Sequence, residues 1–327
     1  MFARGVRGGL VLLLAGLPAA VRSTWTADAG ARPAARTHPS GNMVQAVEVS
    51  DRPYGVAVSA AGAVLVSRLD AASLSRLSLP GRLEPGTLAV GPVPTDVVFS
   101  PPGDIAYVAN QFGHSIGVVD VASGSQVATL PVSGDPFRVV MSADGATLYA
   151  TSNADRVFVF DAGLRVILRS IPVGLDPNGL AQSPDGEFLY VSGQSDGSLT
   201  KVRAATGQTV ARVRVCEEPQ EAVMSPDGEE IYLACGRGAL EIRRAFDLGL
   251  IQRVNEASGG FGMALTPDGE QLYLTQTRLH QVAVVDRAAR RVVRTIPLCG
   301  LPRRIRFSAG GEVAVVADET GAVVFIR

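Results

Sequence analysis

The sequence predicts an all-β fold, a seven-bladed β-propeller with four antiparallel strands in each blade. Two observations support this prediction. A short turn of the Ser-Pro-Asp-Gly type recurs seven times, with 41 or 42 residues between successive turn glycines, a period typical of blade or solenoid repeats. Each repeat also contains short apolar runs bounded by turn-forming residues, without the stripe of an amphipathic helix. The glycines are Gly62, Gly103, Gly145, Gly186, Gly228, Gly269 and Gly311.

The third repeat illustrates the four expected strands. We place them at residues 137–142, 147–151, 157–161 and 166–173, where Val, Ile, Phe and Tyr are frequent. The turn glycine, Gly145, supplies the positive φ that a tight hairpin turn needs. Four short strands in one repeat form one antiparallel blade, and radial repetition of such blades makes a propeller.

Both ends of the repeat array indicate how the ring closes. A proline precedes the first expected strand in six repeats, where the entering strand needs no ladder N–H. The last repeat stops at Arg327, after its third strand, and residues 44–53 match residues 127–136 in length and pattern. We therefore expect this N-terminal segment to supply the outer strand of the last blade and to cover an open edge. The prolines are Pro53, Pro94, Pro136, Pro177, Pro219 and Pro302.

The N-terminal residues have the pattern of a secretory signal peptide over residues 1–20. Arg4 and Arg7 precede a short apolar core, and small residues follow it, as in cleavable signals. The core is shorter than the roughly 20 residues of a membrane-spanning helix, so we expect no transmembrane segment after cleavage. We expect a flexible leader over residues 21–42, the propeller over residues 43–327, and a secreted or periplasmic location. An organelle transit peptide is the alternative, because the leader is rich in arginine and poor in acids.

The composition argues against nucleic acid as a partner. The chain has 30 lysines and arginines, 31 acidic residues and a net charge of -1, and no basic run stands out as an electrostatic footprint. We expect a monomer that binds either another protein or a small anionic ligand.

Several segments resemble the YVTN-family β-propeller repeat. They are residues 107–110 (Tyr-Val-Ala-Asn), 116–120 (Ile-Gly-Val-Val-Asp), 171–174 (Ile-Pro-Val-Gly) and 183–186 (Ser-Pro-Asp-Gly). The resemblance covers residues 43–327 and implies a propeller. Proteins similar to this repeat include exported proteins of unknown role. Related propellers include lactonases of the 6-phosphogluconolactonase type and subunits of quinone-linked amine dehydrogenases.

Three functions follow from the pattern and the resemblance. The first is an exported binding or interaction platform with no assignable reaction. The second is a lactonase-like hydrolase or lyase with its site at the mouth of the central channel. The third is an accessory propeller subunit of an exported redox enzyme.

The residues after each proline are the candidate site, because they should begin the innermost strands and line the channel mouth. Charges of both signs converging on a concave, aromatic-lined mouth are typical of a small-ligand site. The alternative is a solvated set of ion pairs, each contributing about 0–1 kcal/mol. In the lactonase hypothesis, Arg138, Glu221 and Arg304 bind an anionic or lactone substrate. Asp96 or Glu221 acts as the acid–base group. The candidate residues are Tyr54, Asp96, Phe137, Arg138, Glu221, Phe261, Arg303 and Arg304.

Metal and cofactor sites are not indicated by the sequence. His114 and His280 occupy equivalent loops on two separate repeats, without neighbouring residues at metal-ligand spacing, so we interpret them as turn residues. We expect neither a metal nor a cofactor. Cys216 and Cys235 should lie on the same face of the propeller, so a disulfide between them is possible in an exported protein. Cys299 would then remain free.

Overall fold

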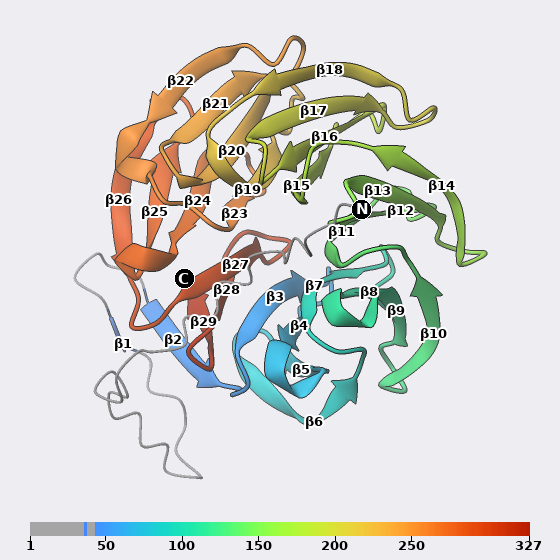
Figure 1. Ribbon diagram of the computed structural model, residues 1–327. Coiled ribbons are helices and arrows are strands. Elements are labelled where there is room, and N and C mark those ends of the chain that lie inside the picture. The colour runs from blue at the N-terminus through green and yellow to red at the C-terminus, as the bar shows by residue number, and fades with distance from the viewer. Residues whose placement is uncertain (1–35, 38–42) are drawn as a thin grey trace, which may run out of the picture. The chain divides into compact units, whose positions relative to one another are not determined.

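The computed structural model describes residues 36–37 and 43–327, which form seven antiparallel sheets around a common axis (Figure 1). The predicted all-β propeller is therefore confirmed. The predicted signal peptide lies outside the described residues, as does most of the predicted leader. The exception is Arg36–Thr37, which forms the short strand β1 and pairs with the next strand of the chain.

Six blades contain four consecutive strands, with the first strand near the axis and the fourth at the rim. The first three blades contain β3 (Pro53–Val58), β4 (Ala63–Arg68), β5 (Ser73–Ser78) and β6 (Arg82–Ala89); β7 (Pro94–Phe99), β8 (Ile105–Asn110), β9 (Ser115–Asp120) and β10 (Ser125–Pro131); and β11 (Pro136–Met141), β12 (Thr147–Ser152), β13 (Arg156–Asp161) and β14 (Val166–Pro172). The next three blades contain β15 (Pro177–Gln182), β16 (Phe188–Gly193), β17 (Ser198–Arg203) and β18 (Thr209–Arg214); β19 (Glu217–Met224), β20 (Glu230–Arg237), β21 (Leu240–Arg244) and β22 (Leu250–Val254); and β23 (Met263–Leu265), β24 (Gln271–Gln276), β25 (Gln281–Asp286) and β26 (Arg291–Pro297).

The helical residues of the described part form single 3-10 turns between or after strands. None of its helices is long and apolar enough to cross a membrane. The turns are η2 (Leu69–Ala71), η3 (Gln111–Gly113), η4 (Asn255–Ala257) and η5 (Thr277–Leu279).

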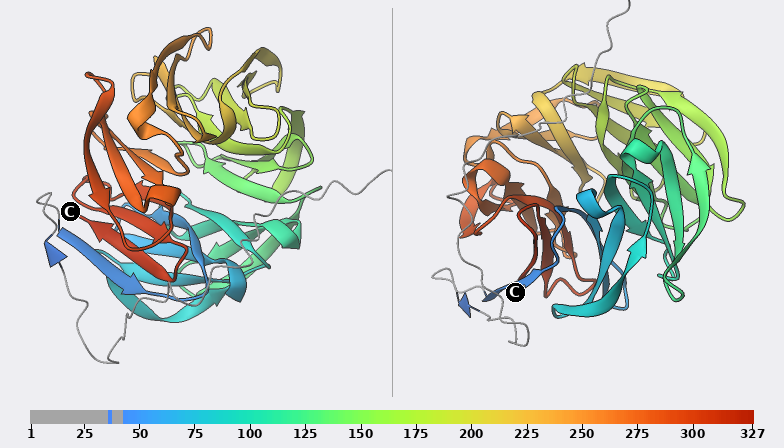
Figure 2. Two further views of the ribbon diagram at one scale, coloured as in Figure 1. Left: turned by 60° about the vertical axis from the view of Figure 1, so that its left-hand side comes forward. Right: turned by 60° about the horizontal axis from the view of Figure 1, so that its bottom comes forward.

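The seventh blade combines both ends of the chain, as the sequence predicts. Its three C-terminal strands are β27 (Pro302–Phe307), β28 (Ala314–Asp318) and β29 (Ala322–Ile326), and β2 (Met43–Glu48) pairs antiparallel with β29. The register places Val44 opposite Ile326 and Glu48 opposite Ala322. Figures 1 and 2 show the blue β2 beside the red β29. This pairing covers the edge of β29 and closes the ring.

Apolar side chains between neighbouring blades form the core. The described residues contain seven buried clusters, each shared by two adjacent blades. The cluster that joins the last blade to the first includes Val47, Val56 and Phe325. The outer strands alternate between exposed and half-buried positions, as in β10. Burial is therefore concentrated in the three inner strands, and each blade depends on its neighbours for stability.

The recurring turn holds each hairpin and also contacts the preceding blade. In the third blade, Asp144 Oδ1 accepts hydrogen bonds from the Ser142 hydroxyl at 2.6 Å and from the Ala146 amide at 2.9 Å. Gly145 has a φ of 71°, which favours glycine. A Cβ at this glycine would lie 2.8 Å from Pro101 Cδ in the turn of the preceding blade. The motif therefore serves both the turn and the contact between blades.

Two tyrosines of the second strands connect their blade to the next one through hydrogen bonds. Tyr107 donates to the carbonyl oxygen of Ala162 at 3.1 Å, and Tyr190 donates to that of Ala245 at 3.0 Å. Each hydroxyl therefore reaches the turn after the third strand of the next blade. A buried tyrosine hydroxyl needs a partner. At the same position, Tyr232 donates to Glu230 Oε2 at 2.5 Å and Tyr273 accepts from Arg294 Nη2 at 2.6 Å, both within their own blades.

Cys216 and Cys235 form a disulfide, with their Cα atoms 5.9 Å apart. It joins the segment that enters the fifth blade to β20 of the same blade, and Cys299 is free and exposed. A bridge over this sequence separation of 19 residues restricts the unfolded chain.

Removal of β2 should strongly destabilise the ring. A chain that begins at Val49 exposes the edge of β29 and loses the burial of several apolar side chains, at about 1.5–3 kcal/mol for each fully buried one. We expect the melting temperature to fall by roughly 10 °C or more, measured by circular dichroism. A chain that begins at Met43 is the control, and equal melting temperatures would contradict closure by β2.

Candidate functional site

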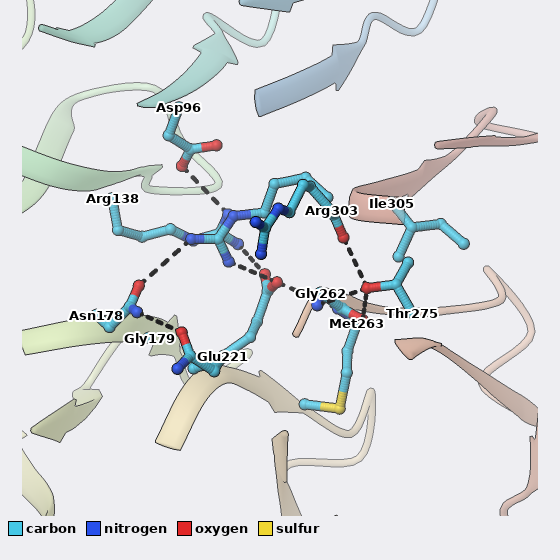
Figure 3. Close-up of polar contacts among 12 residues, drawn as sticks. Asp96, Arg138, Asn178, Gly179, Glu221, Gly262, Met263, Thr275, Arg303 and Ile305 are labelled. Atoms are coloured by element: carbon cyan, nitrogen blue, oxygen red, sulfur yellow. Dashed lines mark hydrogen bonds and ion pairs between the residues drawn. The ribbon is translucent and has the colours of Figure 1, made fainter. Parts of the chain in front are cut away.

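The charged residues that lie two positions after the strand-opening prolines meet at the axis of the ring (Figure 3). They belong to the innermost strands of the second, third, fifth and seventh blades. All are buried, so the alternative of a solvated set of ion pairs does not hold. Asp96, Glu221 and Arg304 are each 0% exposed and Arg138 is 5% exposed.

Glu221 is the centre of this network. Arg304 Nη1 lies 2.7 Å from Glu221 Oε2, and Arg138 Nη2 donates to Oε1. Arg306 Nη2 lies 3.4 Å from the same Oε1. The backbone amide of Met263 donates to Oε2 at 3.1 Å. One carboxylate of the fifth blade therefore binds groups from the third, sixth and seventh blades.

Asp96 occupies the corresponding position in the second blade and makes similar contacts. Its Oδ2 accepts a hydrogen bond from Arg138 Nη1 at 3.2 Å and from the backbone amide of Val139 at 3.1 Å. Asp96 and Glu221 thus each accept a hydrogen bond from a backbone amide of the next blade. This amide lies one residue after the position that corresponds to the carboxylate. Asp96 and Glu221 therefore connect adjacent inner strands and also hold an arginine.

The same position holds glycine in other blades because the inner strands approach closely there. A Cβ at Gly179 would lie 2.7 Å from the backbone nitrogen of Ala222, and one at Gly262 would lie 2.3 Å from the carbonyl oxygen of Arg303. Real Cβ atoms do not approach so closely, so larger residues would separate the blades. The axial position is therefore either a charged member of the network or a glycine.

The electrostatics keep Glu221 ionised. Burial opposes ionisation, but the charges of Arg138, Arg304 and Arg306 outweigh it and lower the pKa of Glu221 to about 2. Burial lowers the pKa of Arg138 to about 10, which leaves its guanidinium charged at neutral pH. Glu221 is therefore a permanent anion at physiological pH.

The aromatic candidates cover the axis where the inner strands begin. Tyr54 packs edge-on against Phe137 and Phe261, with ring centroids 6.1 and 5.7 Å apart. The guanidinium of Arg303 lies 4.8 Å from the Phe261 centroid, and that of Arg304 lies 5.3 Å from it. The residues predicted to line an open mouth therefore pack against one another and cap the charged network.

A cavity of about 480 Å³ lies on the other side of the network, at the ends of the inner strands of six blades. Arg138, Glu221 and Arg306 are its charged lining residues. Arg306 is not among the residues predicted from the sequence, and it lies two residues after Arg304 on β27. Alternation along a strand places such residues on the same side, so this spacing was the available signal.

The arrangement does not assemble a metal centre within residues 36–37 and 43–327. No group of three His, Cys, Asp or Glu side chains lies close enough there to hold an ion. His114 Nδ1 lies 3.2 Å from the carbonyl oxygen of Gly134, and His280 Nδ1 lies 2.7 Å from that of Gly300. Both histidines therefore contact equivalent loops, each of which leads from the histidine's own blade to the next blade.

Comparisons with known proteins support the propeller fold. No protein-family model matches the chain, and no curated protein sequence matches it either. Among solved structures, a chain of the hydrazine synthase of Kuenenia stuttgartiensis is similar, with a TM-score of 0.76 and 21% identity. The match covers 86% of this chain and 97% of that chain. At this identity the likeness shows the fold alone.

Replacement of the central carboxylate should destabilise the ring. Glu221→Gln leaves buried arginines without their anion, and breaking a buried pair in this way costs about 3–5 kcal/mol. We expect a loss of that size in the free energy of unfolding, measured by urea denaturation at pH 7. The exposed Glu48→Gln on β2 is the control, and a loss below about 1 kcal/mol would show that the network is dispensable.

The same carboxylate should make stability depend on pH. Its folded pKa of about 2 lies below its ordinary value of 4.5, so its contribution is complete above pH 4.5 and disappears as the pH falls toward 2. The contribution is about 3 kcal/mol. We expect the difference in unfolding free energy between the unsubstituted protein and Glu221→Gln to shrink over this range. A constant difference would contradict the assignment.

Proposed function

We propose that this chain is an exported binding propeller, a rigid platform that holds another protein and catalyses no reaction of its own. The axial carboxylates support this proposal, because Glu221 is held as an anion by three arginines and Asp96 binds Arg138. A general acid or base must exchange a proton with a substrate, and Glu221 is committed to structural contacts. This favours a platform over a lactonase.

The observation that carries the proposal is the apolar outer strand of the third blade. Val166, Ile167 and Leu168 of β14 are 47%, 43% and 52% exposed, and Leu164 in the preceding turn is 74% exposed. The pairing of β14 with β13 shifts register beside Leu168, so a bulge turns three consecutive apolar residues toward solvent. Edge strands usually carry charges that prevent such exposure.

The equivalent strands of other blades lack this apolar run. The corresponding residues of β10 are Ser125, Gln126 and Val127. The corresponding strand of the sixth blade, β26, begins with Arg291 and carries Arg294 after its bulge. The exposed apolar run is therefore a property of the third blade and not of the repeat, and contiguous exposed apolar surface is typical of protein-binding sites.

The partner we propose is a protein that presents an apolar strand or surface to β14. The free edge of β14 offers backbone groups for strand addition, and its side chains provide specificity. A partner that is an exported redox enzyme is the second candidate function. It is compatible with the fold, which a chain of a hydrazine synthase structure shares. Export is supported by the signal-like N-terminal pattern and by the disulfide, which persists in oxidising compartments.

The proposed protein partner can be tested by changing Leu168. We would place a photo-crosslinking amino acid at this position, expose the protein to the exported fraction of its native cells, and identify the product by mass spectrometry. With the purified partner, Leu168→Glu should raise the dissociation constant at least tenfold, because a charge enters an apolar contact. The melting temperature should not change, because the side chain is exposed.

The matched control is Val293→Glu, which lies at the same position of β26 in the sixth blade and is 41% exposed. It should leave the dissociation constant unchanged. The proposal fails if no protein is crosslinked at Leu168, or if the two substitutions weaken binding equally.

The lactonase hypothesis predicts a different result. We expect glucono-δ-lactone to hydrolyse at the buffer rate in the presence of the protein, because Glu221 cannot serve as an acid at neutral pH. Titration of the released acid at constant pH measures this rate. Saturable hydrolysis that disappears in Asp96→Asn would overturn the non-catalytic platform and favour the hydrolase.

A further inference from the structure

We propose that the axial cavity binds a small monocarboxylate with an apolar body, independently of the protein partner proposed above. The cavity is built from the second halves of the inner strands, and its volume of about 480 Å³ lies in the range of ligand sites, roughly 300–1,000 Å³. The network of Arg138 and Glu221 forms its charged end. The cap of Tyr54, Phe137 and Phe261 lies at the opposite ends of the same strands.

The charges beside the cavity are unbalanced. The axial network contains three arginines, Arg138, Arg304 and Arg306, against the two carboxylates Asp96 and Glu221. The arithmetic is three positive charges minus two negative charges, a formal net charge of +1. A charge that is partly removed from water is stabilised by an ion of opposite sign. One anion next to the network would neutralise it.

Arg306 is the group that can receive this anion. Its side chain is 26% exposed, whereas the other four members of the network are at most 6% exposed. It contacts Glu221 through Nη2 at 3.4 Å, and its Nη1 donates to the carbonyl oxygens of Ile305 at 2.7 Å and Met263 at 3.4 Å. A guanidinium has five N–H donors, so Arg306 retains donors for a carboxylate, which it can bind in a planar, two-bond arrangement.

Arg138 places a second positive charge beside the cavity. Arg138 lines the cavity, and its buried Nε has no hydrogen-bond partner among the described residues. A buried donor without a partner is destabilising. This nitrogen is fully buried, so a ligand in the cavity would act on the positive charge of the Arg138 guanidinium and not through a hydrogen bond to Nε.

The walls specify the rest of the ligand. Toward the opening, the side chains are mainly apolar and include Val98, Val140, Met141 and Val223. The hydroxyl of Ser100 at the rim is occupied in its own turn, because it donates to Asp104 Oδ1 at 2.7 Å and accepts from the amide of Ile105 at 3.1 Å. A single carboxylate therefore matches the charge, and an aliphatic or aromatic body matches the walls. A polyanion such as citrate would exceed the available charge and place polar groups against valines.

The test compares charged and neutral compounds of the same shape. Isothermal titration calorimetry of the full protein would use octanoate, 4-phenylbutyrate and indole-3-butyrate, together with 4-phenylbutanamide and citrate. We expect at least one monocarboxylate to bind with a dissociation constant below about 1 mM. We expect the amide and citrate to bind at least tenfold more weakly.

Two substitutions locate the site. Arg306→Gln should weaken the monocarboxylate at least tenfold, and Val140→Trp should abolish binding by filling the cavity without changing its charge. Arg278→Gln, on an exposed loop turn, is the control and should bind normally. Circular dichroism confirms that each variant is folded.

The alternative outcomes are distinct. The proposal fails if none of the three monocarboxylates binds. It also fails if the amide binds as tightly as 4-phenylbutyrate, because the cavity is then merely apolar. Binding that survives both Arg306→Gln and Val140→Trp would place the site elsewhere. None of these outcomes bears on crosslinking at Leu168, so the protein partner stands or falls separately.

Discussion

The buried carboxylate of Glu221 is the interaction on which the axis of the molecule depends. It connects the fifth blade to Arg138 of the third, Met263 of the sixth, and Arg304 and Arg306 of the seventh. Apolar clusters connect each blade only to its two neighbours, whereas this carboxylate connects blades across the ring. A buried charge that loses its partner destabilises the folded protein strongly. The inner strands are therefore fixed relative to one another. These strands position both the aromatic cap and the charged end of the cavity.

The fold was predictable because its determinants are local and repeated. Turn residues and strand patterns recur every 41 or 42 residues, and they define a blade without long-range information. The match between residues 44–53 and residues 127–136 also predicted the partner of β29, since an unpaired edge must be covered. The sequence could not predict the two-residue strand β1, because a strand of two residues has no pattern of its own.

The candidate site was predictable only in part. The charged residues at the axis lie two positions after the prolines, as predicted. A repeat in the sequence predicts where a residue lies along its strand, but it does not predict the distances between residues of different blades. Arg138 and Arg304 each lie 83 residues from Glu221, and nothing local to any of them specifies the pairing. Their burial depends on how closely the inner strands approach, which the glycines at Gly179 and Gly262 permit. The sequence therefore suggested an open charged mouth where the structure has a capped network.

The two proposed binding surfaces lie in different parts of the propeller. The cavity lies at the axis, whereas β14 lies at the rim, with β12 and β13 between it and the inner strand β11. An anion at Arg306 would compensate charge in a network that is already held by several blades. Its effect would be to stabilise the ring, because allosteric coupling requires a second arrangement that the ligand can favour. A network in which one carboxylate binds three arginines and a backbone amide offers no evident second arrangement. Ligand and protein partner should therefore bind additively, with the propeller acting as a constant frame for both.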